Sequence, residues 1–365
     1  MAPETRSRIG RRLAQAALAL VAWAGTADAA EHAVILEYHH VGTDTPAATS
    51  VTPATFEAHL DYLADNGFHV WPVSRVLGHL ERDKPLPEDT VALTFDDAYA
   101  SVYQEVYPRL RERGWPFTVF VSTDYIDEDY GGYMSWDQLR EVAENGGELG
   151  NHSRSHPHLI RRKAGETEAQ WRKRAVAEIR HAQKRLEEET GGAVGVFAYP
   201  FGEFTAELTA VAGELGFYGV GQQSGAVGAV SDLRAAPRFP MAGGYADLDR
   251  FATKVNSRPL PVTVLSPDSR ILGPKKDRPA LRLRLGEGDF RAAGLACYAS
   301  GQGRMDLTWV DKEAGVAEVR PREPLGPGRS KYNCTAPSAS EAGVYYWYSH
   351  LWMKRAEDGG WYPEP

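Results

Sequence analysis

Hydrophobic and polar positions along residues 31–261 alternate between short apolar runs and amphipathic segments. Each apolar run predicts a buried strand, and the clearest of the predicted strands are residues 33–36, 91–95, 117–121, 148–150, 194–198 and 217–220. Two of the helices between them have clear start signals, Thr52 before Pro53 and Ser135 before Trp136. A long charged helix is expected to end at Gly191. Strands that alternate with helices predict a mainly parallel α/β sheet covered by helices.

Seven or eight candidate strands favour a closed or nearly closed barrel, of a distorted (β/α)7 type, over an open sheet. In such barrels the functional residues lie at the C-terminal ends of the strands. Four segments place polar or unusual residues at such ends, and we expect them to meet at one rim: His39, Asp96-Asp97, His152 to His156, and Tyr199-Pro200-Phe201.

The pattern changes after a proline-rich connection, residues 258–267. Helical periodicity disappears, and Leu281-Arg282-Leu283-Arg284-Leu285 alternates strictly, as a half-buried strand does. Residues 341–347 are similar to the corner of an immunoglobulin-like sandwich. We therefore predict an α/β domain over residues 31–261 and a small immunoglobulin-like β-sandwich over residues 268–365. Its aromatic-dense end serves either as a carbohydrate-binding surface or as core.

The first thirty residues predict a signal peptide for export. Several arginines precede an uncharged apolar run, residues 13–24, and small residues at 27–30 suit a signal peptidase. The run is too short to cross a bilayer comfortably, and no later stretch predicts a transmembrane segment. We therefore expect a periplasmic or secreted protein, in which Cys297 and Cys334 can form a disulfide. Two free buried thiols are the alternative.

The net charge and the chain length exclude fewer classes of function than the motifs do. A formal net charge of -8, with no dominant basic stripe, argues against a nucleic-acid partner. A chain of 365 residues is long enough for one large and one small domain. The sequence gives no indication of the oligomeric state.

Carboxylates and imidazoles form the most informative chemical pattern. Asp96 and Asp97 end a buried strand side by side, and two such carboxylates repel each other unless a cation or hydrogen bonds stabilise them. His152 and His156 are four residues apart, so a turn or helix would place them on one side. One carboxylate and two imidazoles suit Zn²⁺, with Co²⁺ or Ni²⁺ as further options, and the second carboxylate is left as a general base. Surface histidines and a helix-capping aspartate are the structural alternatives.

These motifs resemble those of the polysaccharide deacetylases of carbohydrate esterase family 4, the group with NodB homology, over residues 33–261. Thr94-Phe95-Asp96-Asp97 resembles the first motif, with Ala98 in place of the usual glycine, and His152-Ser153-Arg154-Ser155-His156 resembles the second. The resemblance implies that Asp97, His152 and His156 bind the metal and that Asp96 is the catalytic base.

The third motif of the family is matched only in part. Ala198-Tyr199-Pro200-Phe201 stands in the place of Arg-x-Pro-Tyr, so the arginine that usually orients the catalytic aspartate is missing. Arg238, in Pro237-Arg238-Phe239, is a candidate replacement. The N–H of Phe201 is expected to stabilise the oxyanion, because a main-chain donor does not depend on the side chain. A simple turn is the alternative.

The general acid is expected at the start of the domain. Residues 240–262 contain no histidine, so the family's late Leu-x-His motif is absent. The first strand ends instead in Leu36-Glu37-Tyr38-His39-His40, which is similar to the permuted poly-β-1,6-N-acetylglucosamine deacetylases. This resemblance implies His39 as the acid. His40 is the competing choice, since alternate strand residues face opposite ways, and a structural histidine is the alternative to both.

Together the motifs imply an exported, metal-dependent N-deacetylase that hydrolyses the acetamido groups of an N-acetylglucosamine-containing polysaccharide to free amine and acetate. O-deacetylation, a peptidoglycan or chitin-like substrate, and a non-catalytic glycan-binding module on a degenerate barrel are the alternatives. Tyr125, Tyr130 and Trp136 are candidates for stacking on sugar rings, with a core anchor as the other interpretation of Trp136.

Overall fold

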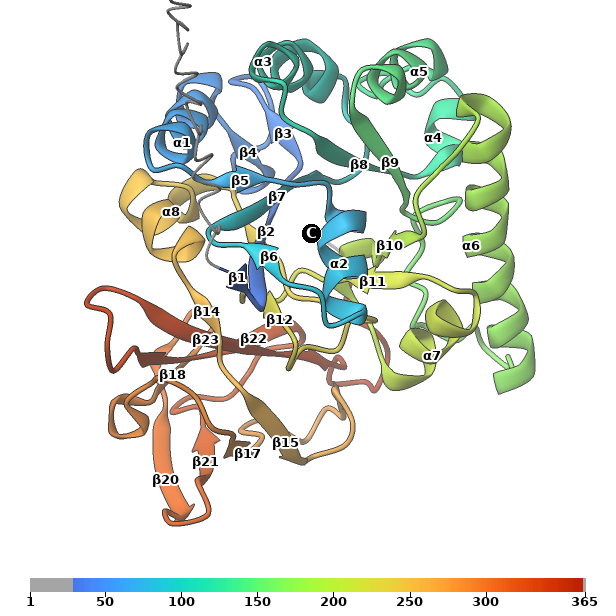
Figure 1. Cartoon of the computed structure of the whole chain (residues 1–365). Coiled ribbons are helices and arrows are strands. Elements are labelled where there is room, and N and C mark those ends of the chain that lie inside the picture. The colour runs from blue at the N-terminus through green and yellow to red at the C-terminus, as the bar shows by residue number, and fades with distance from the viewer. Residues whose placement is uncertain (1–28, 364–365) are drawn as a thin grey trace, which may run out of the picture.

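A computed structural model describes residues 29–363 as an α/β unit followed by an all-β unit (Figure 1). The predicted signal peptide lies outside the described residues except for its last two, which form β1 (Ala29–Ala30) and pair with β6 (Leu86–Pro87). No helix of the described part is both long and apolar enough to cross a membrane.

A curled, mainly parallel sheet forms the α/β unit. Its strands follow one another in the order β11 (Tyr218–Val220), β10 (Val196–Ala198), β9 (Gly147–Asn151), β8 (Phe117–Val121), β7 (Thr90–Phe95), β2 (His32–Tyr38) and β12 (Val227–Gly228). β5 (His69–Val70) pairs with β7, and β12 is antiparallel to β2. The predicted parallel α/β class is confirmed.

Closure of this sheet depends on one short segment. β13 (Phe239–Pro240) pairs in parallel with β2, and a single bridge joins Val220 of β11 to Ala236. Residues 236–240 therefore connect β11, at one end of the sheet, to β2, near the other end, through two paired positions and one bridge. The complete seven-unit barrel stays a prediction, because the sheet is a curled half-barrel with this narrow connection.

Alternate residues of β2 separate an outer from an inner core. Val34 and Leu36 pack in the cluster that includes the outer helices, whereas Ala33 and Ile35 belong to a second cluster with α2 (Val73–Glu81). The other helices are α1 (Pro53–Asp65), α3 (Tyr107–Arg113), α4 (Thr123–Asp127), α5 (Trp136–Glu144), α6 (Glu168–Thr190), α7 (Ala206–Glu214) and α8 (Leu248–Val255).

The predicted helix boundaries are confirmed where local chemistry specifies them. Thr52 caps α1 by accepting a hydrogen bond from the N–H of Thr55, and Ser135 forms a capping box with Gln138 at the start of α5. α6 ends at Gly191, whose left-handed conformation suits glycine. α2, α3, α4, α7 and α8 were not predicted.

A buried histidine connects α1 to the segment before α8. His59 is 0% exposed, and its Nε2 donates to the carbonyl of Ala246 at 2.7 Å while its Nδ1 accepts from the hydroxyl of Tyr38 at 3.0 Å. The ring also stacks on Phe251. Burial lowers the pKa of His59 to about 4, although the Ala246 hydrogen bond opposes the shift. His59 is therefore neutral in the folded protein at neutral pH.

Two β-sheets form the second unit. One contains β14 (Arg258–Pro259), β23 (Tyr345–Lys354), β22 (Gly328–Pro337), β18 (Ala296–Ala299) and β19 (Gly303–Arg304), with β16 (Ile271–Leu272) also paired to β23. The other contains β15 (Val262–Ser266), β17 (Leu281–Leu285), β21 (Val316–Arg320) and β20 (Asp306–Asp311). Much of the predicted connection, residues 258–267, thus forms strands of these sheets.

The predicted disulfide is confirmed between Cys297 and Cys334, and it joins directly paired positions of β18 and β22. In antibody domains the conserved disulfide instead joins the two sheets. The immunoglobulin-like topology therefore stays a prediction. Of the aromatic side chains at the end of the chain, Trp352 is core, Trp347 and Trp361 pack against clusters of the α/β unit, and Tyr345 is 38% exposed.

Candidate active site

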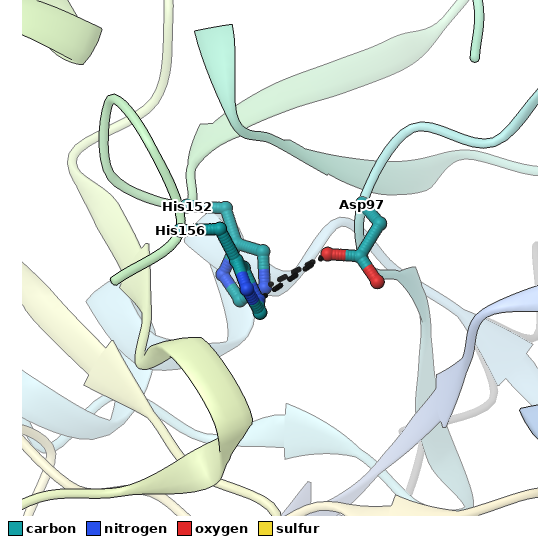
Figure 2. Close-up of side chains that lie close together, drawn as sticks. All are labelled: Asp97, His152 and His156. Carbon is teal, nitrogen blue, oxygen red and sulfur yellow. Dashed lines mark ion pairs between the residues drawn. The ribbon is translucent and has the colours of Figure 1, made fainter. Parts of the chain in front are cut away.

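Two strand ends of the curled sheet bring the predicted metal ligands together (Figure 2). Asp97 lies two residues beyond β7, and His152 lies directly after β9, with His156 in the following loop. The Oδ1 atom of Asp97 is 3.4 Å from Nε2 of His152 and 3.4 Å from Nε2 of His156. The three ligand atoms lie within 4.8 Å of one another, so one cation could contact all three.

Unusual backbone conformations gather at this site. Among the described residues, eight that are not glycine have a positive φ, and five of them belong to the candidate motifs: Asp97, Ala98, Ser153, His156 and Phe201. Such conformations cost on the order of 1–3 kcal/mol each and persist only where the surroundings enforce them. At Ala98 the φ of 56° also explains why a glycine would suit this position.

The donor set fits a divalent cation. His152 donates from Nδ1 to the carbonyl of Ala198 at 2.8 Å, which leaves Nε2, 3.4 Å from Oδ1 of Asp97, as the ring nitrogen available to a cation. Metal-binding histidines commonly have such a partner on the second ring nitrogen. Two imidazoles and one carboxylate are a frequent ligand set of catalytic zinc and leave a further coordination position open.

The three side chains also shift one another's pKa. Burial disfavours the ionised form of Asp97, yet the hydrogen bond and charge of His152 outweigh it and hold the pKa of Asp97 far below its usual range. Burial lowers the pKa of His156 to about 4, and the charge of His152 adds to this effect. The site therefore offers an ionised carboxylate and, at His156, a neutral imidazole.

Arg238, the candidate replacement for the arginine missing from the third motif, binds Asp96. The guanidinium of Arg238 donates from Nη1 to Oδ1 and from Nη2 to Oδ2 of Asp96, both at 2.7 Å, and both residues are 0% exposed. Arg238 also donates to the carbonyl of Gly221 at 2.8 Å and to Thr94 at 3.1 Å. Burial opposes ionisation of Asp96, but the charge and hydrogen bonds of Arg238 lower its pKa.

The two histidines at the end of β2 lie in different surroundings. His39 continues the inward-facing row of β2, and its Nδ1 atom is 3.9 Å from Oε1 of Glu37. Ligand atoms of Glu37, His39 and Asp96 lie within 4.8 Å of one another. His40 instead stacks on Tyr99, with ring centroids 3.6 Å apart. Of the two, His39 is the one grouped with Asp96.

Glu37 is a site residue that the sequence interpretation missed. It is 1% exposed, its Oε2 atom has no hydrogen-bond partner among the described residues, and that atom lies 3.9 Å from Arg238. Burial raises the pKa of Glu37 despite the opposing charge of Arg238. A signal was present, because a glutamate two residues before His39 in an apolar strand must face the same side.

The remaining predicted residues lie in different surroundings. Phe201 lies in the 3-10 turn η3 (Pro200–Gly202), with its ring 4.4 Å from that of His156. Tyr125 stacks on Tyr133 at 4.8 Å, and Tyr130 is 51% exposed. Trp136 donates from Nε1 to Asp127 at 2.9 Å and packs against the outer core, as a helix anchor does.

Sequence comparison relates the chain to known proteins. Residues 83–220 match the family model described as polysaccharide deacetylase. The Bacillus subtilis protein YxkH, provisionally named a polysaccharide deacetylase, is 27% identical over 213 residues, which are 58% of this chain and 72% of that protein. The poly-β-1,6-N-acetyl-D-glucosamine N-deacetylase of Escherichia coli is 30% identical over 111 residues, which are 26% of this chain and 16% of the relative.

Structure comparison gives the same fold. The deacetylase PplD of Streptococcus pyogenes, solved in complex with acetate, superposes with a TM-score of 0.56 at 21% identity. The match covers 61% of this chain and 98% of that one. At this identity the likeness concerns the fold alone.

Proposed function

We propose that the protein is a hydrolase of acetylated glycans that removes N-acetyl groups from a polysaccharide containing N-acetylglucosamine. The match of residues 83–220 to the polysaccharide deacetylase family model supports this proposal. The observation that carries this proposal is the convergence of Asp97, His152 and His156 beside the buried Asp96–Arg238 pair. The similarity to the Escherichia coli N-deacetylase supports N-acetylglucosamine as the sugar.

The chain's own residues have distinct roles in this mechanism. A divalent cation held by Asp97, His152 and His156 would polarise the acetyl carbonyl and acidify a water molecule. Asp96, kept ionised and fixed by Arg238, accepts the proton of the attacking water. The N–H of Phe201 donates to the oxyanion. His39 donates a proton to the departing sugar amine, which leaves poorly without one.

Zinc is the cation we propose, because the two-imidazole, one-carboxylate set suits it, and Co²⁺ or Ni²⁺ also fits these donors. Export is part of the proposal and is supported by the pattern of residues 1–30 and by the Cys297–Cys334 disulfide. For the second unit we propose an immunoglobulin-like arrangement of its two sheets and a carbohydrate-binding surface.

The decisive experiment measures acetate release from poly-β-1,6-N-acetylglucosamine, chitin oligomers, peptidoglycan and an O-acetylated glycan. We expect release from the first substrate, its loss with a chelator, and its recovery with Zn²⁺. Asp97→Asn should abolish both activity and zinc uptake, whereas Asp61→Asn, a change at a residue whose side chain is 60% exposed, should alter neither. Release only from the O-acetylated glycan, or activity that survives chelation and Asp97→Asn, would contradict the proposal.

A further inference from the structure

The turn that carries Phe201 is a strained element of the site. Phe201 has a φ of 59° and Gly202 a φ of 67°. A Cβ atom at position 202 would lie 2.6 Å from the Cβ atom of Gln222, so the turn also leaves no space for a side chain there. A bulky residue keeps a left-handed conformation only where its surroundings hold it.

Glu203, the residue after this turn, joins three distant segments. It is 1% exposed, and its Oε2 atom accepts a hydrogen bond from Nδ1 of His158 at 2.9 Å. Its Oε1 atom accepts from the hydroxyl of Tyr362 and lies 3.4 Å from Nη1 of Arg329 and 3.7 Å from Nη2 of Arg161. We call Glu203 with these four partners the Glu203 junction.

The junction connects the site to the second unit. His158 follows the metal ligand His156 by two residues, and its ring stacks on Phe201 with centroids 3.8 Å apart. Arg329 belongs to β22 and lies 5.3 Å from the centre of the Phe201 ring. Tyr362 follows β23. Groups from the second unit therefore contact both the Phe201 ring and the carboxylate beside its turn.

The second unit packs against the α/β unit near the Phe201 turn. Leu351 and Met353 of β23, together with Trp361, share an apolar cluster with Leu159 and Phe204 of the α/β unit. In addition, Lys331 of β22 donates from Nζ to the carbonyl of Gln222 at 2.5 Å, and Gln222 is the residue that a side chain at position 202 would meet. These contacts fix the second unit against the same turn from two directions.

We propose that the all-β unit is part of the catalytic apparatus and that, through the Glu203 junction, it holds the Phe201 turn in the conformation that places its N–H for the oxyanion. Glu203 and Tyr362 are then positioning residues of the reaction. This inference rests on the proposed deacetylase function. Because an oxyanion donor acts mainly in the transition state, its displacement lowers kcat more than it changes KM.

The test compares Tyr362→Phe and Glu203→Gln with the control Tyr332→Phe, whose buried hydroxyl donates to Pro279 within the second unit. Complete loss of an oxyanion donor costs about 10²–10³ in kcat, and we expect displacement to lower kcat about tenfold, with KM changed less than about twofold. Hydrogen exchange at Gly202 and Glu203, whose N–H groups bond within the turn, should accelerate. The control should change neither quantity.

Acetate release tests the proposed deacetylase function, and hydrogen exchange in the Phe201 turn tests the Glu203 junction separately. If the wild type releases no acetate, the proposed function fails, while exchange in the turn still tests the junction. Unchanged exchange and kcat in Tyr362→Phe would overturn the inference. So would an equal acceleration of exchange throughout the α/β unit, because that result indicates a general effect on stability. Tyr362→Phe removes a single oxygen atom, so the test does not depend on the folding of Glu203→Gln.

Discussion

Replacement of Arg238 by methionine tests the electrostatic arrangement of the site most directly. The substitution leaves the carboxylate of Asp96 buried without the two 2.7 Å hydrogen bonds that it accepts in the folded protein. Breaking a fully buried ion pair from one side costs about 3–5 kcal/mol, because the remaining charge stays desolvated. We therefore expect the free energy of unfolding, measured in urea, to fall by about this amount.

A double-mutant cycle distinguishes this cause from simple loss of packing. Asp96→Asn combined with Arg238→Met removes both charges, so the double variant should be more stable than Arg238→Met alone. If the stability losses of the two single variants add up to the loss in the double variant within about 0.5 kcal/mol, the reasoning is refuted. Arg174→Met is the matched control: its partner Glu166 lies at a more exposed site where water can hydrate the remaining charge, so this variant should lose much less stability than Arg238→Met.

The same variants have a catalytic consequence. Arg238→Met should lower kcat/KM about 10²-fold, because Asp96 loses the orientation that the forked guanidinium provides. Arg238→Lys should recover only part of this loss, since an ammonium group keeps the charge but cannot make the two parallel hydrogen bonds. Activity of Arg238→Met within about twofold of wild type would show that Asp96 is oriented by other groups.

Three further predictions concern the acid, acid stability and the disulfide. His39→Ala should lower kcat for acetate release about 10²–10⁴-fold and His40→Ala less than about tenfold; the opposite order would assign the acid to His40. Since the pKa of His59 is about 4 in the folded protein against 6.5 unfolded, its stabilising contribution is complete above pH 6.5 and is lost as the pH falls toward 4. Between pH 7 and 4.5 wild type should therefore lose roughly 2 kcal/mol more stability than His59→Gln, and equal losses would contradict this. Reducing the bond between Cys297 and Cys334, 37 residues apart, should cost about 4 kcal/mol in thermal or denaturant unfolding, and a loss under about 1 kcal/mol would contradict it.

Sequence reasoning succeeded where the signal was local. The caps at Thr52 and Ser135 are encoded within four residues, and the structure has both. The spacing of His152 and His156 likewise needs only the local turn. By contrast, Arg238 reaches Asp96 across 142 positions of the chain, so its role depends on residues 236–240 returning to β2. Sequence could name Arg238 only as a candidate.

The Glu203 junction lay beyond sequence reasoning for a related reason. Glu203 follows the family motif and, in the sequence, is one of many acidic residues between predicted elements. Its partners Arg329 and Tyr362 come from a unit whose sheets and docking no local pattern specifies. A buried carboxylate in a loop becomes informative only when its cationic and hydroxyl partners are known, because an unpaired buried charge is costly.

The alternation along β2 explains why one strand can serve both the core and the chemistry. Ala33 and Ile35 fill the inside of the curled sheet, and Glu37 and His39 continue the same inward row at the end of the strand. On the inward face of β2, the change from apolar to ionisable residues therefore marks where the hydrophobic core ends and the active site begins. A slip of one residue in the pairing of β2 would turn Tyr38 to the inward face in place of Glu37 and turn His39 outward. The paired register of β2 with β7, which sets Glu37 opposite Thr94, is thus a condition of the site as well as of the fold.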